Sequence, residues 1–101
     1  MSKQCMIRRE TRREKLAKKF AAKRAELRVI KNDPGATLEE KLAAQAAFAK
    51  LQRDSALVRG RRRCWKTGRA HGVYRAVGMC RNMFRIHAMN GDIPGIHKDS
   101  W

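Results

Sequence analysis

The first third of the chain carries its large apolar residues at helical spacing. They recur at intervals of four, seven and three positions, which places them on one face of a helix: Leu16, Phe20, Leu27 and Ile30. Alanines within residues 17–25 add helix propensity. The pattern predicts one long amphipathic helix. We expect it to end at residues 32–35, because this Asn-Asp-Pro-Gly sequence is typical of a type I or II turn.

A second helix is predicted directly after the turn. Thr37 and Glu40 have the spacing of a capping box, in which each side chain accepts a hydrogen bond from the other residue's backbone N–H. An apolar stripe follows along one side of this helix: Leu38, Leu42, Ala46 and Ala49, with Phe48 and Leu51 nearby. Helix, tight turn and helix make an αα-hairpin. We expect the stripe to pack the two helices together.

The regular pattern disappears from Arg53 onward. Residues 53–78 are rich in Arg, Gly, Ser and Thr without periodicity, which predicts irregular backbone. A short third helix is predicted by Met79, Met83, Ile86 and Met89, with Asn90-Gly91 as a left-handed C-cap and a turn at residues 93–96. The predicted fold class is mainly α. An extended N-terminal αα-hairpin over residues 1–53 precedes an irregular C-terminal module over residues 54–101 that contains the short helix.

Positive charge dominates the composition. The 101 residues contain 25 Lys and Arg but only 9 Asp and Glu, a formal net charge of +16. Residues 1–31 carry 12 basic and 3 acidic side chains and residues 59–101 carry 10 and 2, whereas the segment between them is nearly neutral. Such charge repels itself until a polyanion neutralises it, and each phosphate that is contacted releases counterions. We therefore expect a nucleic-acid partner, although charge alone fits RNA, DNA or anionic lipid.

Other classes of protein are disfavoured by what the sequence lacks. No stretch approaches the ~20 consecutive apolar residues of a membrane span, and no signal peptide or transit segment is recognisable. A membrane-surface role is the weaker alternative, because the apolar stripe of the first helix is narrow and Ala-rich. Three widely spaced cysteines do not form a disulfide framework, which favours a reducing compartment. No acid–base pair, activated nucleophile or phosphate-binding glycine loop is present, so we expect neither catalysis nor a small-molecule substrate.

Two of the cysteines occur at a metal-ligand spacing. Cys64-x2-Thr67-x12-Cys80-x2-Met83 is the spacing of a zinc ribbon whose second and fourth ligands are replaced. Thr and Met are poor zinc ligands, and His71 would raise the number of competent ligands only to three. We expect a degenerate, metal-less site and no cofactor, while weak residual zinc binding stays open. The missing ligands also disfavour a DNA-binding zinc module.

Many residues after position 58 match the pattern of a known family. The matching residues are Arg61, Arg63-Cys64, Thr67-Gly68-Arg69, His71-Gly72, Arg75, Gly78, Arg81, Arg85, Gly91, Ile93-Pro94-Gly95, Lys98 and Ser100-Trp101, with earlier support from Met6 and residues 22–27 and 51–55. This pattern resembles the small-subunit ribosomal protein S-fourteen family. The zinc form of that family has Cys-x2-Cys-x12-Cys-x2-Cys at this place, and its longer zinc-free form lacks part or all of it. The middle helix resembles the long form.

The chain also departs from that family's pattern. The departures are Gln52 for Pro, Ala56-Leu57 for Ser-Pro, Arg62 for Asn, Ala70 for Pro, Val77 for an aromatic residue and Ile86 for Glu. Lost prolines loosen the loops, most of all in the unfolded chain. Cys80 and Phe84 resemble the zinc form. The chain thus resembles a divergent member of the long, zinc-free form.

The resemblance implies a structural constituent of the small ribosomal subunit that acts in translation. It implies binding to small-subunit rRNA in the head, the 3′ major domain, with late assembly there and a position near the decoding A site. The neighbours implied are ribosomal proteins S-three, S-ten and S-nineteen. The implied location is the ribosome of the bacterial cytoplasm or of an organelle, either mitochondrion or plastid. The C-terminal module would be a zinc-ribbon-like rRNA-binding element without metal.

The predicted RNA contacts are basic and aromatic side chains. Arg and Lys neutralise phosphates, and aromatic rings stack on unpaired bases. Trp65 and Tyr74 have two alternatives, stacking on RNA or packing against the third helix. The predicted RNA-binding residues are Arg8, Arg9, Arg12, Arg13, Lys15, Lys19, Lys23, Arg24, Arg59, Arg61, Arg62, Arg63, Lys66, Arg69, His71, Tyr74, Arg75, Arg81, Arg85, Lys98 and Trp101.

Overall fold

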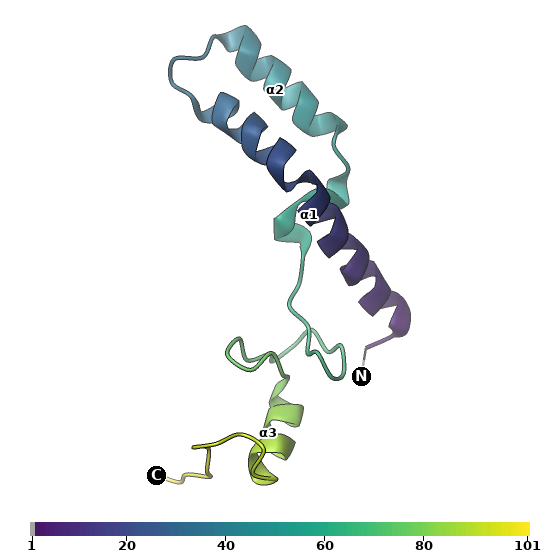
Figure 1. Cartoon of the computed structure of the whole chain (residues 1–101), viewed down its shortest axis with the longest axis vertical. Helices are drawn as coiled ribbons and strands as arrows, with labels where there is room; N and C mark the ends of the chain where they lie inside the picture. The colour runs from purple at the N-terminus through teal and green to yellow at the C-terminus, as the bar shows by residue number, and fades with distance from the viewer. Residues whose placement is uncertain (1) are drawn as a thin grey trace. The chain divides into compact units, whose positions relative to one another are not determined.

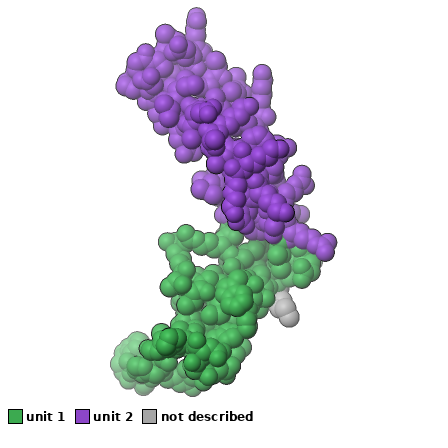
Figure 2. Space-filling model, viewed as in Figure 1, with its two compact units in different colours: residues 1–7, 61–101 green, residues 8–60 purple. Residues whose placement is uncertain are grey.

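The structure, a computed structural model, describes residues 2–101 and confirms a mainly helical fold (Figure 1). Within this range it has three α-helices and two short 3₁₀ turns, and no strand. The chain forms two compact units, one of residues 8–60 and one of residues 2–7 with 61–101 (Figure 2). We call them the helical unit and the loop unit. The division into domains at residues 53 and 54 stays a prediction.

Helix α1 spans Gln4–Asn32 and confirms the predicted long helix and its end at the turn. None of its 29 residues is buried. Leu16, Phe20 and Leu27 are half-buried, whereas Ile30 is exposed near the end of the helix. This helix is therefore a charged rod with one half-covered apolar stripe. It is not apolar enough to cross a membrane, and the same holds for the shorter helices of residues 2–101.

Helix α2 spans Leu38–Lys50 and begins at the predicted capping box. The backbone N–H of Glu40 donates to the Thr37 hydroxyl at 3.3 Å, and the backbone N–H of Thr37 donates to the Glu40 carboxylate at 3.0 Å. The turn before it is closed by the Asp33 carboxylate, which accepts a hydrogen bond from the N–H of Gly35 at 2.9 Å. Side-chain acceptors thus satisfy backbone donors that have no partner within the helix.

The predicted packing stripe of α2 is wrong. Leu38 and Leu42 are 73% and 60% exposed, and the one buried residue of the helix is Ala44. Contact with α1 involves Phe48, whose ring lies 5.8 Å from the Arg24 guanidinium. The apolar residues of this Ala-rich helix form several overlapping stripes. Periodicity alone does not show which of these stripes faces α1. A small side chain such as Ala44 lets another backbone approach closely, whereas leucines at the edge turn outward.

Two 3₁₀ turns, η1 (Arg53–Ser55) and η2 (Leu57–Arg59), follow α2 where irregular backbone was predicted. Ser55 is the buried residue of this segment. Its hydroxyl accepts a hydrogen bond from Nε of Arg24 at 3.0 Å and donates to the carbonyl of Gln52. The 3₁₀ segment is thereby attached to the last third of α1 by a part-buried polar contact.

Helix α3 spans Arg81–Met89, two residues shorter at its start than predicted. Cys80 has extended backbone angles as the N-cap, so Met79 and Cys80 precede the helix and lie in the core. Met79 fits the helical spacing of the other methionines, but it lies before the helix. It is apolar because it packs in the core. The predicted left-handed C-cap is confirmed by Gly91, whose φ is 81°.

Candidate nucleic-acid interface

A tight loop over residues 64–69 begins the loop unit's core. The N–H of Cys64 donates to the carbonyl of Arg69, and the N–H of Gly68 donates to the carbonyl of Cys64, both at 2.8 Å. Gly68 has a φ of 73°, a left-handed conformation that glycine adopts without strain. A Cβ at this position would lie 2.5 Å from Cδ1 of Ile7, so the loop packs closely against the first turn of α1.

A second loop leads from His71 into α3. The N–H of Tyr74 donates to the carbonyl of Met79 at 2.9 Å, and the N–H of Gly78 donates to the carbonyl of Tyr74 at 2.8 Å. The N–H of Trp65 donates to the carbonyl of Gly78 at 3.2 Å, which joins this loop to the first. Two loops without regular secondary structure are therefore fixed by backbone hydrogen bonds.

The two loops enclose the degenerate ligand positions. Cys64 and Cys80 are both 2% exposed, and Thr67 and Met83 are half-buried beside them. Burial raises the pKa of Cys64, but hydrogen bonds from the Thr67 hydroxyl and from backbone N–H groups of residues 80, 67 and 66 lower it more, to about 6. The fold thus stabilises a thiolate at Cys64.

These residues do not fit a zinc ion. Structural zinc sites use four thiolate or imidazole ligands, whereas Thr67 and Met83 offer a hydroxyl and a thioether. Residues 2–101 contain no group of three or more His, Cys, Asp or Glu side chains placed to hold a metal. His71 is exposed and does not complete the set.

The structure separates the predicted RNA-binding residues into two groups by exposure. Arg13, Arg24, Arg59, Arg63 and Arg69 are half-buried. Most of the basic side chains point to solvent, and with the aromatic residues they make up the larger, exposed group: Arg8, Arg9, Arg12, Lys15, Lys19, Lys23, Arg61, Arg62, Lys66, His71, Tyr74, Arg75, Arg81, Arg85, Lys98 and Trp101.

Four of the half-buried arginines bind other parts of the chain, and we call Arg13, Arg24, Arg59 and Arg63 the anchored arginines. Nε of Arg13 and Nε of Arg59 lie 3.5 and 3.3 Å from the same Asp54 carboxylate oxygen. In the loop unit Nη1 of Arg63 donates to the Ser2 hydroxyl at 3.1 Å and to the carbonyl of Gly68 at 3.0 Å. The number of arginines in the sequence does not show which of them stabilise the fold and which are available to contact RNA.

Exposed cations gather on one face of α1. Arg8, Arg12, Lys15 and Lys19 line an open groove of about 430 Å³ together with Thr11 and Leu16. Spacings of three and four positions place these side chains along one side of the helix. Successive turns of a regular helix therefore present a row of positive charge.

The exposed aromatic residues have different surroundings. Tyr74 packs against Phe84 of α3 with ring centroids 4.9 Å apart, which agrees with the predicted alternative of packing against the third helix. Trp65 stays 66% exposed, with the Lys66 ammonium 5.6 Å from its ring centroid. Trp101 is fully exposed at the chain's end. Trp65 and Trp101 therefore keep ring surface available for a partner.

Sequence reasoning missed a polar chain that positions Lys66. The Lys66 ammonium donates to Nε2 of His87 at 2.8 Å, and Nδ1–H of His87 donates to the Asp92 carboxylate at 2.6 Å. His87 and Asp92 flank the C-terminus of α3 at a separation of five positions. The Asn90-Gly91 cap between them was the available signal, because it folds the chain back toward the helix.

Comparison with known proteins identifies the family of this chain. A family described as ribosomal protein S14p/S29e matches residues 47–100. Proteins named small ribosomal subunit protein uS14 from Alkalilimnicola ehrlichii, Francisella philomiragia and Xanthomonas campestris are each 50% identical to this chain over all 101 residues, the full length of both chains. The resemblance to the S-fourteen family is thereby confirmed. The chain belongs to the ribosomal protein S14 family, whose members are structural proteins of the small ribosomal subunit and not enzymes.

Proposed function

We propose that this protein binds small-subunit rRNA in the head, the 3′ major domain, and holds its conformation near the decoding A site. The observation that carries the proposal is the separation of the arginines by exposure. The anchored arginines stabilise each unit internally, while cations on α1 and on the loop unit remain exposed to solvent. Fixed loops with exposed Arg side chains suit irregular RNA, where phosphates do not follow a regular groove.

The proposal includes a place and a set of neighbours. The bacterial relatives support a location on the ribosome in the bacterial cytoplasm. Late assembly into the head and contact with proteins S-three, S-ten and S-nineteen are the finer parts of the proposal. The poor zinc ligands at two of the four positions support a loop unit that folds without zinc. Cross-linking of intact subunits followed by mass spectrometry tests the neighbours, and cross-links only to proteins outside the head would contradict them.

Two adjacent arginines test RNA binding. Arg62 is exposed, and no hydrogen bond or ion pair with another residue of 2–101 holds it, whereas Arg63 is anchored. Affinity for a transcript of the 3′ major domain is measured against salt for Arg62→Ala and Arg63→Ala. We expect Arg62→Ala to lower the salt slope by about 0.7 to 0.9 with unchanged stability. Arg63→Ala should instead lower the free energy of unfolding, because it removes two hydrogen bonds made by a charged group.

The α1 row gives a larger change in the same assay. A triple variant of Arg8, Arg12 and Lys15 to alanine should lower the salt slope by about two to three, since each lost phosphate contact contributes about 0.7 to 0.9. Duplex DNA of equal length serves as the competitor. Unchanged slopes in both the triple variant and Arg62→Ala, or tighter binding to the DNA, would contradict the proposal.

A further inference from the structure

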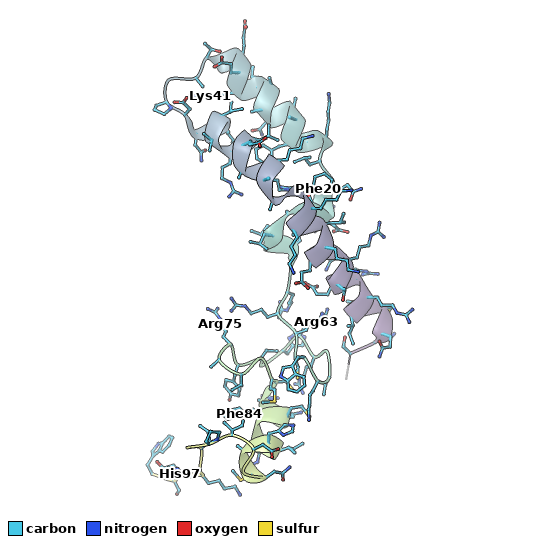
Figure 3. All side chains as sticks on the ribbon, in the orientation of Figure 1. Phe20, Lys41, Arg63, Arg75, Phe84 and His97 are labelled. Atoms are coloured by element: carbon cyan, nitrogen blue, oxygen red, sulfur yellow. The ribbon has the colours of Figure 1, made fainter. Side chains whose placement is uncertain are left out.

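Sulfur-containing side chains cluster at the N-terminal end of α3, near the Phe84 label in Figure 3. Cys64, Met79 and Cys80 form one buried contact cluster, with exposed fractions of 2%, 8% and 2%. Met83 is half-buried and packs against this cluster. Cys80 is the N-cap and Met83 lies three positions later, so the two lie on the same side of the first turn. The fold brings two thiols and a thioether to one place.

Hydrogen-bond donors surround both thiols. The Thr67 hydroxyl lies 3.8 Å from Sγ of Cys80 and also hydrogen-bonds the sulfur of Cys64. Backbone N–H groups of residues 66, 67 and 80 donate to the same Cys64 sulfur. Cys80 stands at the N-terminus of α3, where the helix dipole favours a negative charge. Cysteine binds metals through its deprotonated sulfur, and these donors remain as hydrogen-bond partners for metal-bound sulfurs.

The chemistry of these donors selects the kind of metal. Zinc prefers four thiolate, imidazole or carboxylate ligands, and the cluster offers only two. Thiolate and thioether together are soft ligands, which favour Cu(I). We propose that Cys64, Cys80 and Met83 form a binding site for Cu(I). The site uses residues outside the exposed cations and does not depend on RNA binding.

The binding step transfers no electron. Each cysteine that is still protonated releases its proton to water as its sulfur bonds the metal, and the Met83 thioether donates a lone pair without a proton change. Two thiolates and one monovalent cation leave one net negative charge, which a chain of formal charge +16 accommodates. Met79, buried on the same cluster, helps to exclude water from the bound ion.

The test is an anaerobic metal competition on the full chain. A Cys5→Ser background removes the exposed third thiol, so only Cys64 and Cys80 remain. Cu(I) is added as its acetonitrile complex and competed with a chromophoric Cu(I) chelator, and Zn(II) is titrated separately. We expect one tightly held Cu(I) per chain and weaker zinc binding. Met83→Leu should lower the Cu(I) affinity by at least the roughly 10-fold to 100-fold that loss of an outer-shell partner costs.

A second methionine of α3 provides the matched control. Met89 lies on the same helix, is exposed and is not part of the cluster, so Met89→Leu should leave Cu(I) affinity unchanged. Circular dichroism of both variants checks that the helix persists. Equal affinities for Met83→Leu and Met89→Leu would overturn the assignment of Met83. Zinc binding tighter than Cu(I) binding, or Cu(I) binding that survives Cys64→Ser and Cys80→Ser together, would overturn the site itself.

Discussion

The helical unit and the loop unit are stabilised in different ways. In the helical unit only Ala44 and Ser55 are buried, and its shape depends on helix hydrogen bonds, a capping box and ion pairs. The loop unit instead has a small core of Cys64, Met79 and Cys80, enclosed by loops that hydrogen-bond to one another. A long helix satisfies its backbone hydrogen bonds within itself and presents charge with little core, whereas irregular loops need a core to hold a single conformation.

This comparison explains where arginines become anchored. Arg63 binds the carbonyl of Gly68 in the loop unit, where a bend leaves backbone acceptors without helix partners. In the helical unit Arg13 and Arg59 share the Asp54 carboxylate, which follows the last turn of α2. In both units a guanidinium fixes a junction that regular secondary structure does not reach.

The largest effect is expected at the loop unit's core and depends on pH. Because the pKa of Cys64 is about 6 in the folded chain and 9.0 ordinarily, the unfolded chain binds more protons between these values. The free energy of unfolding of the metal-free chain should rise with pH across this window, and the contribution is lost as pH falls toward 6. Each tenfold difference in proton affinity between the folded and the unfolded chain corresponds to ~1.4 kcal/mol of stability.

Urea unfolding followed by circular dichroism at both ends of the window measures this contribution. Cys64→Ala should remove most of the difference in stability between them, because alanine has no proton to lose. An unchanged pH dependence in Cys64→Ala would show that other groups cause it, and the thiolate would then not stabilise the loop unit.

The next effect concerns the tight loop at residue 68. Gly68→Ala should lower the free energy of unfolding by about 1 to 2 kcal/mol, the cost of a left-handed conformation for a non-glycine residue. Crowding against Ile7 adds to this cost, since the new Cβ would lie 2.5 Å from Cδ1.

Gly91→Ala separates the two causes. Gly91 has a similar φ of 81°, but nothing lies within 4 Å of a Cβ there. The stability lost in Gly91→Ala therefore reports the cost of the left-handed conformation alone. Thermal unfolding of both variants gives the difference. Equal losses would mean that Ile7 moves aside without cost and that loop packing contributes little.

A smaller effect is expected at the start of α2 in the helical unit. Thr37→Ala removes the capping box and should cost about 1 kcal/mol, because a backbone N–H loses its acceptor. Thr37→Ser keeps the hydroxyl and is the control. Urea unfolding measures both, and helicity by circular dichroism reports fraying of α2. A loss shared equally by Thr37→Ser would point to the Thr37 methyl group and not to the cap.

The smallest effect is expected at Asp54. Asp54→Asn keeps an oxygen acceptor and only weakens the two ion pairs with Arg13 and Arg59, so it should cost a fraction of the about 0.2 to 1 kcal/mol that each partly exposed pair contributes. The loss should shrink at high salt because solvent ions screen the charges. Glu14→Gln, which removes only an exposed pair with Lys18 along α1, should change stability less. A loss at Asp54 that is unaffected by salt would indicate a hydrogen-bonding role.

Local signals in the sequence predicted the elements well. The turn at residues 32–35, the Thr37 capping box and the Gly91 cap were confirmed because each depends on a few neighbouring residues. The start of α3 and the packing stripe of α2 were wrong. Both depend on which apolar side chain meets a partner distant in sequence, and periodicity alone does not contain that information. The predicted RNA contacts stay predictions, now divided by exposure.

The sequence by itself determined the helices, the strongly basic character and membership of the ribosomal protein S14 family. Propensity, caps and charge are properties of residues close together in the chain, so they can be read directly. Only the tertiary structure decided which arginines are anchored and that Cys64 and Cys80 share one buried cluster. Burial and long-range hydrogen bonds arise when distant segments meet, and the same side chain then acquires a different role.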